Sequence, residues 1–185
     1  FITCLIPLIL GFIIPVSVLL NFVLKGYAVV NISEVVDTAF TSISISFVAS
    51  TAIMLLSFLM VVVATYKSNT FQKSLIFLAS CGYAFPGTIL AVGVVVFVGW
   101  LNDIFYFHMS YFIGGFLVLI FAYTLRFLAI GNGSIRSGVT RINPNLIDAS
   151  RTMGRSFLTT MKKVILPLTY TNILVGGILV FVDIL

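Results

Sequence analysis

The hydrophobic positions of this chain are gathered into long runs that contain no charged residue. Five runs lack Asp, Glu, Lys and Arg altogether: residues 1–24, 38–66, 74–102, 104–125 and 164–182. A helix needs about 20 apolar residues to cross the ~30 Å hydrocarbon core of a bilayer. The runs are continuously apolar, whereas strands of a membrane barrel alternate apolar and polar positions. The pattern therefore predicts an all-α fold, a polytopic transmembrane helical bundle.

The expected organisation is a single transmembrane domain, 1–185, with about five spans. The spans are expected at about 1–24, 38–66, 74–100, 108–130 and 167–185, and a polar segment of about 131–166 separates the last two. Phe1 opens inside an apolar run, and Leu185 closely follows Asp183. We therefore expect a chain truncated at both ends. The first run lacks the basic start and small-residue cleavage site of a signal peptide.

Composition and charge agree with a membrane protein. Hydrophobic residues make up 61% of the chain and charged residues 8%, against roughly a quarter charged in soluble domains. Lys and Arg in short loops mark the cytoplasmic side. One basic residue, Lys25, falls on the expected outer side, and eight fall on the inner side: Lys67, Lys73, Arg136, Arg141, Arg151, Arg155, Lys162 and Lys163. Topology thus explains the net charge of +5 without a nucleic-acid partner.

Four residues within or directly beside the runs are unusual for a membrane helix. Pro86 followed by Gly87 predicts either a local break, as in transporters, or a plain kink at a helix interface. Asp183 lies near the far end of the last run, and ionisable residues inside membranes suggest a role. Pro86, Gly87 and Asp183 are therefore candidates for the translocation path. Arg126 lies near the inner end of the fourth run, where its side chain is expected to reach the interface.

The remaining chemistry argues against an enzyme. A catalytic or metal site needs clustered His, Asp or Glu, but the chain has one histidine, His108, and five scattered acids. Cys4 and Cys81 form no CxxC pair and are interpreted as small buried residues. There is no GxxxxGK[ST] phosphate loop. We expect no catalytic residue, bound cofactor or metal. A secondary transporter or channel would need ionisable residues at mid-membrane, and Asp183 is the one candidate.

The polar segment contains NLIDASRTMGRSFLTTMKKVILPL, residues 145–168, and its apolar residues recur at helical spacing. Asn143 and Pro144 are typical of a helix start, and Gly154 predicts a break. Two stripes of spaced residues are expected, and they share Phe157. The first consists of Leu146, Ser150, Met153 and Phe157, and the second of Phe157, Met161, Val164 and Leu168. Pro167 marks the passage into the last span. An amphipathic helix of this kind either rests on anionic lipid or docks into a groove on a soluble partner, and a charged loop that retains topology is a third interpretation.

The spacing within this segment resembles a known motif. Asp148-Ala149-Ser150, then Gly154, then Leu166-Pro167 is similar to the EAA loop of binding-protein-dependent ABC importer permeases, which reads Glu-Ala-Ala, three residues, Gly, nine residues, Ile-x-Leu-Pro. The departures are Asp for Glu, Ser for the second Ala, and Val164 for Ile. The resemblance implies that this loop couples the permease to its ATPase, through Leu146, Ile147, Asp148, Ala149, Ser150, Met153, Gly154, Leu166 and Pro167.

Further segments extend the resemblance over most of the chain. PLILGFIIPVSVLL, YAFPGTILAVG, AYTLRFLA and LVFVD resemble the second half of the fused ferric-iron permeases, relatives of the thiamine and polyamine permeases. This implies the type I importer fold and, most specifically, iron(III) uptake. Import of thiamine, a polyamine or another small solute is the alternative, and a secondary transporter or channel is a more distant one.

The resemblance also implies a set of partners. These are an ABC nucleotide-binding subunit that holds ATP and Mg²⁺, a periplasmic or lipid-anchored substrate-binding protein, and a homologous other permease half. The chain would be a multi-pass protein of the bacterial inner membrane, with the basic coupling loop in the cytoplasm. No nucleic-acid partner is implied.

Overall fold

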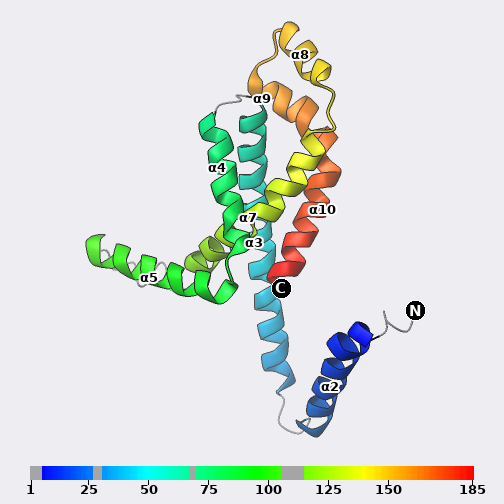
Figure 1. Ribbon diagram of the computed structural model, residues 1–185, viewed down its shortest axis with the longest axis vertical. Coiled ribbons are helices and arrows are strands. Elements are labelled where there is room, and N and C mark those ends of the chain that lie inside the picture. Colours follow the sequence, from blue (N-terminus) through cyan, green and yellow to red (C-terminus); the bar gives the residue numbers. More distant parts are fainter. Residues whose placement is uncertain (1–5, 27–30, 67–69, 106–114) are drawn as a thin grey trace. The chain divides into compact units, whose positions relative to one another are not determined.

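The computed structural model describes residues 6–26, 31–66, 70–105 and 115–185. Every regular element among them is a helix, which confirms the predicted all-α fold (Figure 1). The elements are η1 (Ile9–Ile13), α2 (Ile14–Gly26), α3 (Ile32–Tyr66), α4 (Thr70–Cys81), η3 (Gly82–Ala84), α5 (Gly87–Phe105), α7 (Phe116–Val139), α8 (Pro144–Thr152), α9 (Phe157–Thr160), η4 (Met161–Ile165) and α10 (Leu166–Ile184). They fall into two compact units, Phe1–Thr41 and Ser42–Leu185.

Five helices in the described part of the chain are long and apolar enough to cross a membrane. They are Ile6–Gly26, Ile32–Thr65, Gly87–Ile104, Phe116–Val139 and Phe157–Ile184. The third differs from the expected span 74–100, because a shorter apolar helical segment, Ser74–Ala84, precedes the break at Pro86. The fourth and fifth extend into the polar segment 131–166. Only residues 140–143 and 153–156 of that segment lie outside helices.

The first unit contains a helix whose described side chains are all exposed. It widens into a π-turn at η1, where the Ile14 N–H donates to the Ile9 carbonyl, directly before Pro15. Proline lacks an N–H and its ring crowds the carbonyl four residues earlier. One wider turn therefore lets the helix pass the proline and continue to Gly26.

The core of the second unit is built around α7 and α10, which approach closely because of small residues. A Cβ added to Gly138 on α7 would lie 2.8 Å from Asn172 Cγ on α10. A Cβ on Gly176 of α10 would lie 2.6 Å from Ser134 Oγ on α7. Small residues allow this approach between membrane helices. Buried side chains of α3 and α7 complete the core, among them Ile53, Val62, Phe127 and Ile135.

Hydrogen bonds between α7 and α10 explain why α7 continues beyond residue 130. The Ser134 hydroxyl donates to the Asn172 carbonyl at 2.7 Å, and Asn172 Nδ2 donates to Ser137 Oγ at 3.0 Å. The Ser137 hydroxyl donates in turn to the Ser134 carbonyl at 2.9 Å. The sequence Gly131-Asn132-Gly133-Ser134 has poor helix propensity. Tertiary packing and these bonds stabilise it as helix.

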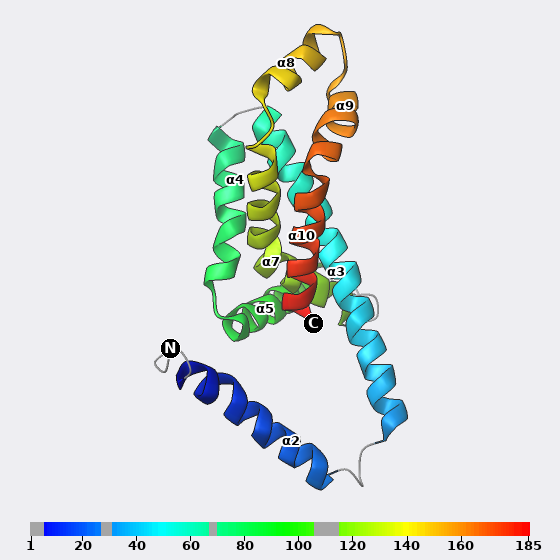
Figure 2. The ribbon, with the colours of Figure 1, turned by 90° about the vertical axis from the view of Figure 1, so that its right-hand side faces the viewer.

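Figures 1 and 2 place the polar segment within the second unit. The end of α3, the start of α4, and α8 and α9 gather at one end of this unit in both views. At the other end of α4 the chain turns, and α5 runs across the direction of α4.

Candidate functional site

The candidate site is the segment around α8, and capping defines the helix at its start. The Asn145 N–H donates to Asn143 Oδ1 at 3.0 Å, and Pro144 occupies the first helical position. The Leu146 N–H donates to the Asn143 carbonyl at 3.0 Å. An Asn cap satisfies a free N–H of the first turn, and Pro loses nothing there. The helix thus begins where the sequence predicts.

Gly154 ends α8 with a left-handed residue. Its φ is +73°, and the Arg155 N–H reaches back to the Ser150 carbonyl at 3.2 Å. This bond and the positive φ form the Schellman arrangement that ends many helices. A Cβ at Gly154 would meet no atom within 4 Å, so backbone conformation, not space, favours glycine here.

The two faces of α8 have different surroundings. Ile147 packs against the core of the second unit. Ser150 is 5% exposed, and its hydroxyl is 2.8 Å from Thr160 Oγ1. Thr160, the last residue of α9, is fully buried. Leu146 and Met153, in contrast, are 49% and 70% exposed. One face therefore holds α8 to the chain, and the other presents apolar side chains outward.

This arrangement corrects the predicted stripe of Leu146, Ser150, Met153 and Phe157. Ser150 and Phe157 face the body of the chain, while Leu146 and Met153 are exposed together with Ala149. Helical spacing of apolar residues does not distinguish the inward face from an outward one. The buried hydroxyl pair decides it, because an unpaired hydroxyl would be costly inside. No sequence signal marks Thr160 as the partner of Ser150.

A cavity of about 390 Å³ lies beneath α8. Its lining from α8 consists of Pro144, Ile147 and Asp148. The end of α3, the end of α7 with the turn that follows it, and Ile165 of η4 complete the lining. Asp148 takes part in a polar interaction as well. The space beside the base of α8 is therefore only partly filled.

The chain from α9 onward is one continuous helix, Phe157–Ile184. Ser156 caps its start and accepts from the Thr159 N–H at 3.4 Å. Pro167 does not interrupt it, because the π-turn η4 precedes the proline and the Leu166 N–H donates to the Met161 carbonyl. Leu166 and Pro167 are exposed at the beginning of α10. The segment after α8 thus leads directly into the last membrane helix.

The chain leaves the helix at Pro86, so the third expected span contains a break and not a plain kink. Phe85 is extended, with φ −83° and ψ 138°, and α5 begins at Gly87. The residue before a proline favours this conformation. A Cβ at Gly82 would collide with the Leu125 carbonyl oxygen, and one at Gly87 with Arg126 Nη1. The break is therefore pressed against α7.

Arg126 lies near the middle of α7, which continues to Val139. Its Nε is buried without a hydrogen-bond partner in the described part of the chain. Asp183 lies exposed in the last turn of α10.

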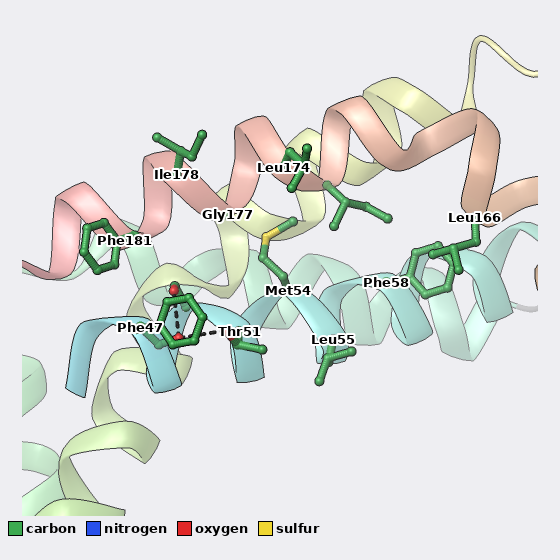
Figure 3. Close-up of a pocket in the computed structure, with 12 residues that line it drawn as sticks. Phe47, Thr51, Met54, Leu55, Phe58, Leu166, Leu174, Gly177, Ile178 and Phe181 are labelled. Atoms are coloured by element: carbon green, nitrogen blue, oxygen red, sulfur yellow. Dashed lines mark hydrogen bonds between the residues drawn. The ribbon is translucent and has the colours of Figure 1, made fainter. Parts of the chain in front are cut away.

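A pocket of about 510 Å³ lies between α3 and α10 and contains few polar groups (Figure 3). Its lining is almost wholly apolar, and the hydroxyls of Ser50 and Thr51 both donate to the Phe47 carbonyl, at 3.1 and 2.8 Å. Side chains such as Met54 and Phe58 face it from α3, and Leu174 and Phe181 from α10. Such a pocket suits apolar groups.

No metal centre is found in the described part of the chain. No group of three or more His, Cys, Asp or Glu side chains is close enough to hold an ion there. His108 and Cys4 lie outside the described residues. Cys81 is a free thiol whose Sγ donates to the Phe77 carbonyl at 3.3 Å.

Taken together, the apolar helices define a polytopic membrane protein, and α8 is a short helix with one packed and one exposed face. A family model described as "Binding-protein-dependent transport system inner membrane component" matches residues 61–185. The chain belongs to this family. It is a multi-pass inner-membrane permease subunit of an ABC importer, a transport protein that works with an ATPase and a substrate-binding protein. A comparison with curated proteins gave no match.

Proposed function

We propose that α8 is the coupling helix through which this permease engages its ATPase on the cytoplasmic side. The observation that carries the proposal is the division of α8 into two faces. Ile147 and Ser150 attach it to the chain, whereas Leu146, Ala149 and Met153 are exposed. An exposed apolar stripe on a short helix fits a groove on a partner protein.

The EAA-like spacing favours the ATPase over a lipid surface. Asp148 and Gly154 take the acidic and glycine places of that motif, and Gly154 has the φ that ends the helix. Leu166 and Pro167 take its ending and lie at the start of α10. A helix that only rests on lipid would not need this spacing over some twenty residues.

The continuous helix from α9 into α10 supplies a mechanism. Ser150 joins α8 to Thr160, and the same helix runs on to Ile184. When ATP and Mg²⁺ on the partner ATPase drive closure of its subunits, a displacement of α8 is carried into the membrane. The permease halves then move as rigid bodies between inward- and outward-facing states. This chain holds no cofactor in that scheme.

The proposed cargo is iron(III), delivered by a periplasmic or lipid-anchored binding protein and moved along a path shared with a homologous permease half. Support comes from the resemblance of YAFPGTILAVG, AYTLRFLA and LVFVD to ferric-iron permeases. Pro86, Gly87 and Asp183 are the proposed path residues. Thiamine, a polyamine or another small solute is the alternative cargo.

The coupling proposal is tested in proteoliposomes that contain the assembled transporter. The double variant Leu146→Gln/Met153→Gln removes the outward apolar face without touching Ile147 or Ser150. Because truncating interface anchors often costs 2 kcal/mol or more, ATP hydrolysis stimulated by the binding protein should fall by about tenfold or more. Leu158→Gln is the matched control, since Leu158 is an equally exposed leucine on α9.

The control should keep at least half of the stimulated activity, and ATPase copurification should weaken only in the double variant. Full stimulation in the double variant would show that α8 is not the coupling helix. The cargo is tested separately, by uptake of radioactive iron(III), thiamine and putrescine into cells that lack this permease. Selective loss of iron uptake supports the iron(III) proposal, and selective loss of another solute assigns the permease to that solute.

A further inference from the structure

Arg126 is a charged residue within α7, a helix long and apolar enough to cross a membrane. Arg126 lies near the centre of α7, and its Nε is buried and makes no hydrogen bond within the described residues. No ion pair of Arg126 is found among the described residues, and its guanidinium lies 5.4 Å (Cζ) from the centroid of the Phe127 ring and beside Gly87. Ionisable residues within membrane-spanning helices are expensive to maintain and mark functional sites.

The helix break at Pro86 fixes where this guanidinium lies. A Cβ at Gly87 would collide with Arg126 Nη1 and would lie 2.8 Å from Cζ. A Cβ at Gly82 would collide with the Leu125 carbonyl, one residue earlier on α7. The break therefore packs against α7 at Leu125 and Arg126. The Arg126 side chain is partly exposed and lies beside Gly87, the first residue of α5.

The start of α5 adds positive potential at the same place. α5 is 19 residues long and begins at Gly87. The N–H groups of its first turn have no partner within the helix, and the helix dipole places partial positive charge there. Both contributions have the same sign as the guanidinium. The site thus repels a bare cation and attracts an anion.

We propose that the Arg126 guanidinium, beside Gly87 at the start of α5, binds an anionic oxygen group of the transported species, a phosphate or carboxylate. Guanidinium groups bind such oxygens through two parallel hydrogen bonds. This inference rests on the proposed role as an importer permease and narrows its cargo to an anion or a metal in an anionic complex. Iron(III) would then pass Arg126 with phosphate or carboxylate ligands, not as a bare ion.

The first test measures the local potential chemically and needs no transport. In the assembled transporter, Cys4→Ser and Cys81→Ser remove the native thiols, and Thr88→Cys introduces one beside Gly87. The rates of its modification by an anionic sulfonate and by a cationic trimethylammonium methanethiosulfonate are compared. We expect Arg126→Gln to lower the anionic-to-cationic rate ratio at least about tenfold. Arg126→Lys should keep most of the ratio because it keeps the charge.

Arg136→Gln is the matched control, since Arg136 is an exposed arginine near the far end of α7. It should leave the ratio unchanged. Inorganic phosphate at millimolar concentration should slow the sulfonate reagent when Arg126 is present and not in Arg126→Gln. This phosphate protection is measured with arginine in place, so it decides the question even where Arg126→Gln assembles poorly.

Three results overturn the proposal: an unchanged rate ratio in Arg126→Gln, no reaction of either reagent at position 88, or no protection by phosphate. The outcome is separable from the cargo proposal. If iron(III) uptake does not depend on this permease but phosphate protection and the charge ratio behave as expected, the anion site stands and the iron(III) assignment fails. If iron uptake depends on the permease, but Arg126→Gln leaves the rate ratio unchanged and phosphate gives no protection, the anion site is wrong.

Discussion

The helix α8 and the α7–α10 pair are held to the same unit in opposite ways. α7 and α10 approach so closely that Gly138 and Gly176 have no room for a Cβ, and hydrogen bonds through Asn172 join them. α8 is held by Ile147, the Ser150–Thr160 hydroxyl pair and a polar interaction of Asp148, and a cavity of about 390 Å³ adjoins it. Dense packing is suited to transmitting a movement, and a short helix with one exposed face is suited to receiving one.

The largest expected effect comes from filling the α7–α10 contact. Gly138→Ala places a Cβ within 2.8 Å of Asn172 Cγ, so the Asn172 side chain must move and give up its bond to Ser137. Overpacking of this kind typically costs about 2 kcal/mol of the free energy of unfolding. Gly133→Ala on the same helix is the control, because its Cβ meets no atom within 4 Å.

The control should change stability in the opposite direction, with a gain of up to about 1 kcal/mol from helix propensity. Unfolding in mixed detergent micelles with increasing SDS measures both variants. Equal effects of the same sign would show that α7 and α10 are not in close contact at Gly138.

A smaller loss is expected where α8 joins α9. Ser150→Ala leaves the buried Thr160 hydroxyl without its partner, which should cost about 1–2 kcal/mol. The double variant Ser150→Ala/Thr160→Val removes both polar groups and should cost less than the sum of the two single variants. The difference, measured as a double-mutant cycle, should be about 1 kcal/mol. Strict additivity would mean that the two hydroxyls do not interact.

Gly154→Ala should cost about 1 kcal/mol, because an L-residue with a side chain is strained in the left-handed region. Gly154→Asn is the paired variant and should cost less, since Asn tolerates this conformation. The change should be local, so amide hydrogen exchange should speed up in α8 and stay unchanged in α10. Equal exchange in Gly154→Ala and the native chain would show that the positive φ at this residue is not needed.

Much of the fold was predictable because it depends on local pattern. Uncharged runs of some twenty residues predict membrane helices, and Asn143-Pro144 and Gly154 mark the two ends of α8. The helix α7 continues to Val139, beyond the expected span boundary at about 130. The contacts that keep this region helical come from α10, some forty residues later, and no local pattern reveals them.

The candidate site was predictable in composition but not in geometry. The EAA-like spacing selects Asp148, Gly154 and Pro167, yet it does not show which side chains of α8 face outward. That depends on Thr160, which carries no signal of its own in the sequence. The environment of Arg126 was missed for a similar reason, since it depends on where α7 ends and on the break at Pro86.

The outward face of α8 should contribute least to stability, which is the sharpest contrast with α7 and α10. Met153 is 70% exposed, so Met153→Gln should change the free energy of unfolding by less than about 0.5 kcal/mol. Detergent unfolding of the isolated permease measures this, with Ile147→Gln, on the packed face of α8, as the destabilising counterpart. If Met153→Gln destabilised the permease as much as Ile147→Gln, Met153 would be packed within this chain. A near-zero effect on stability together with weakened ATPase binding would instead place the function of this side chain outside its own subunit.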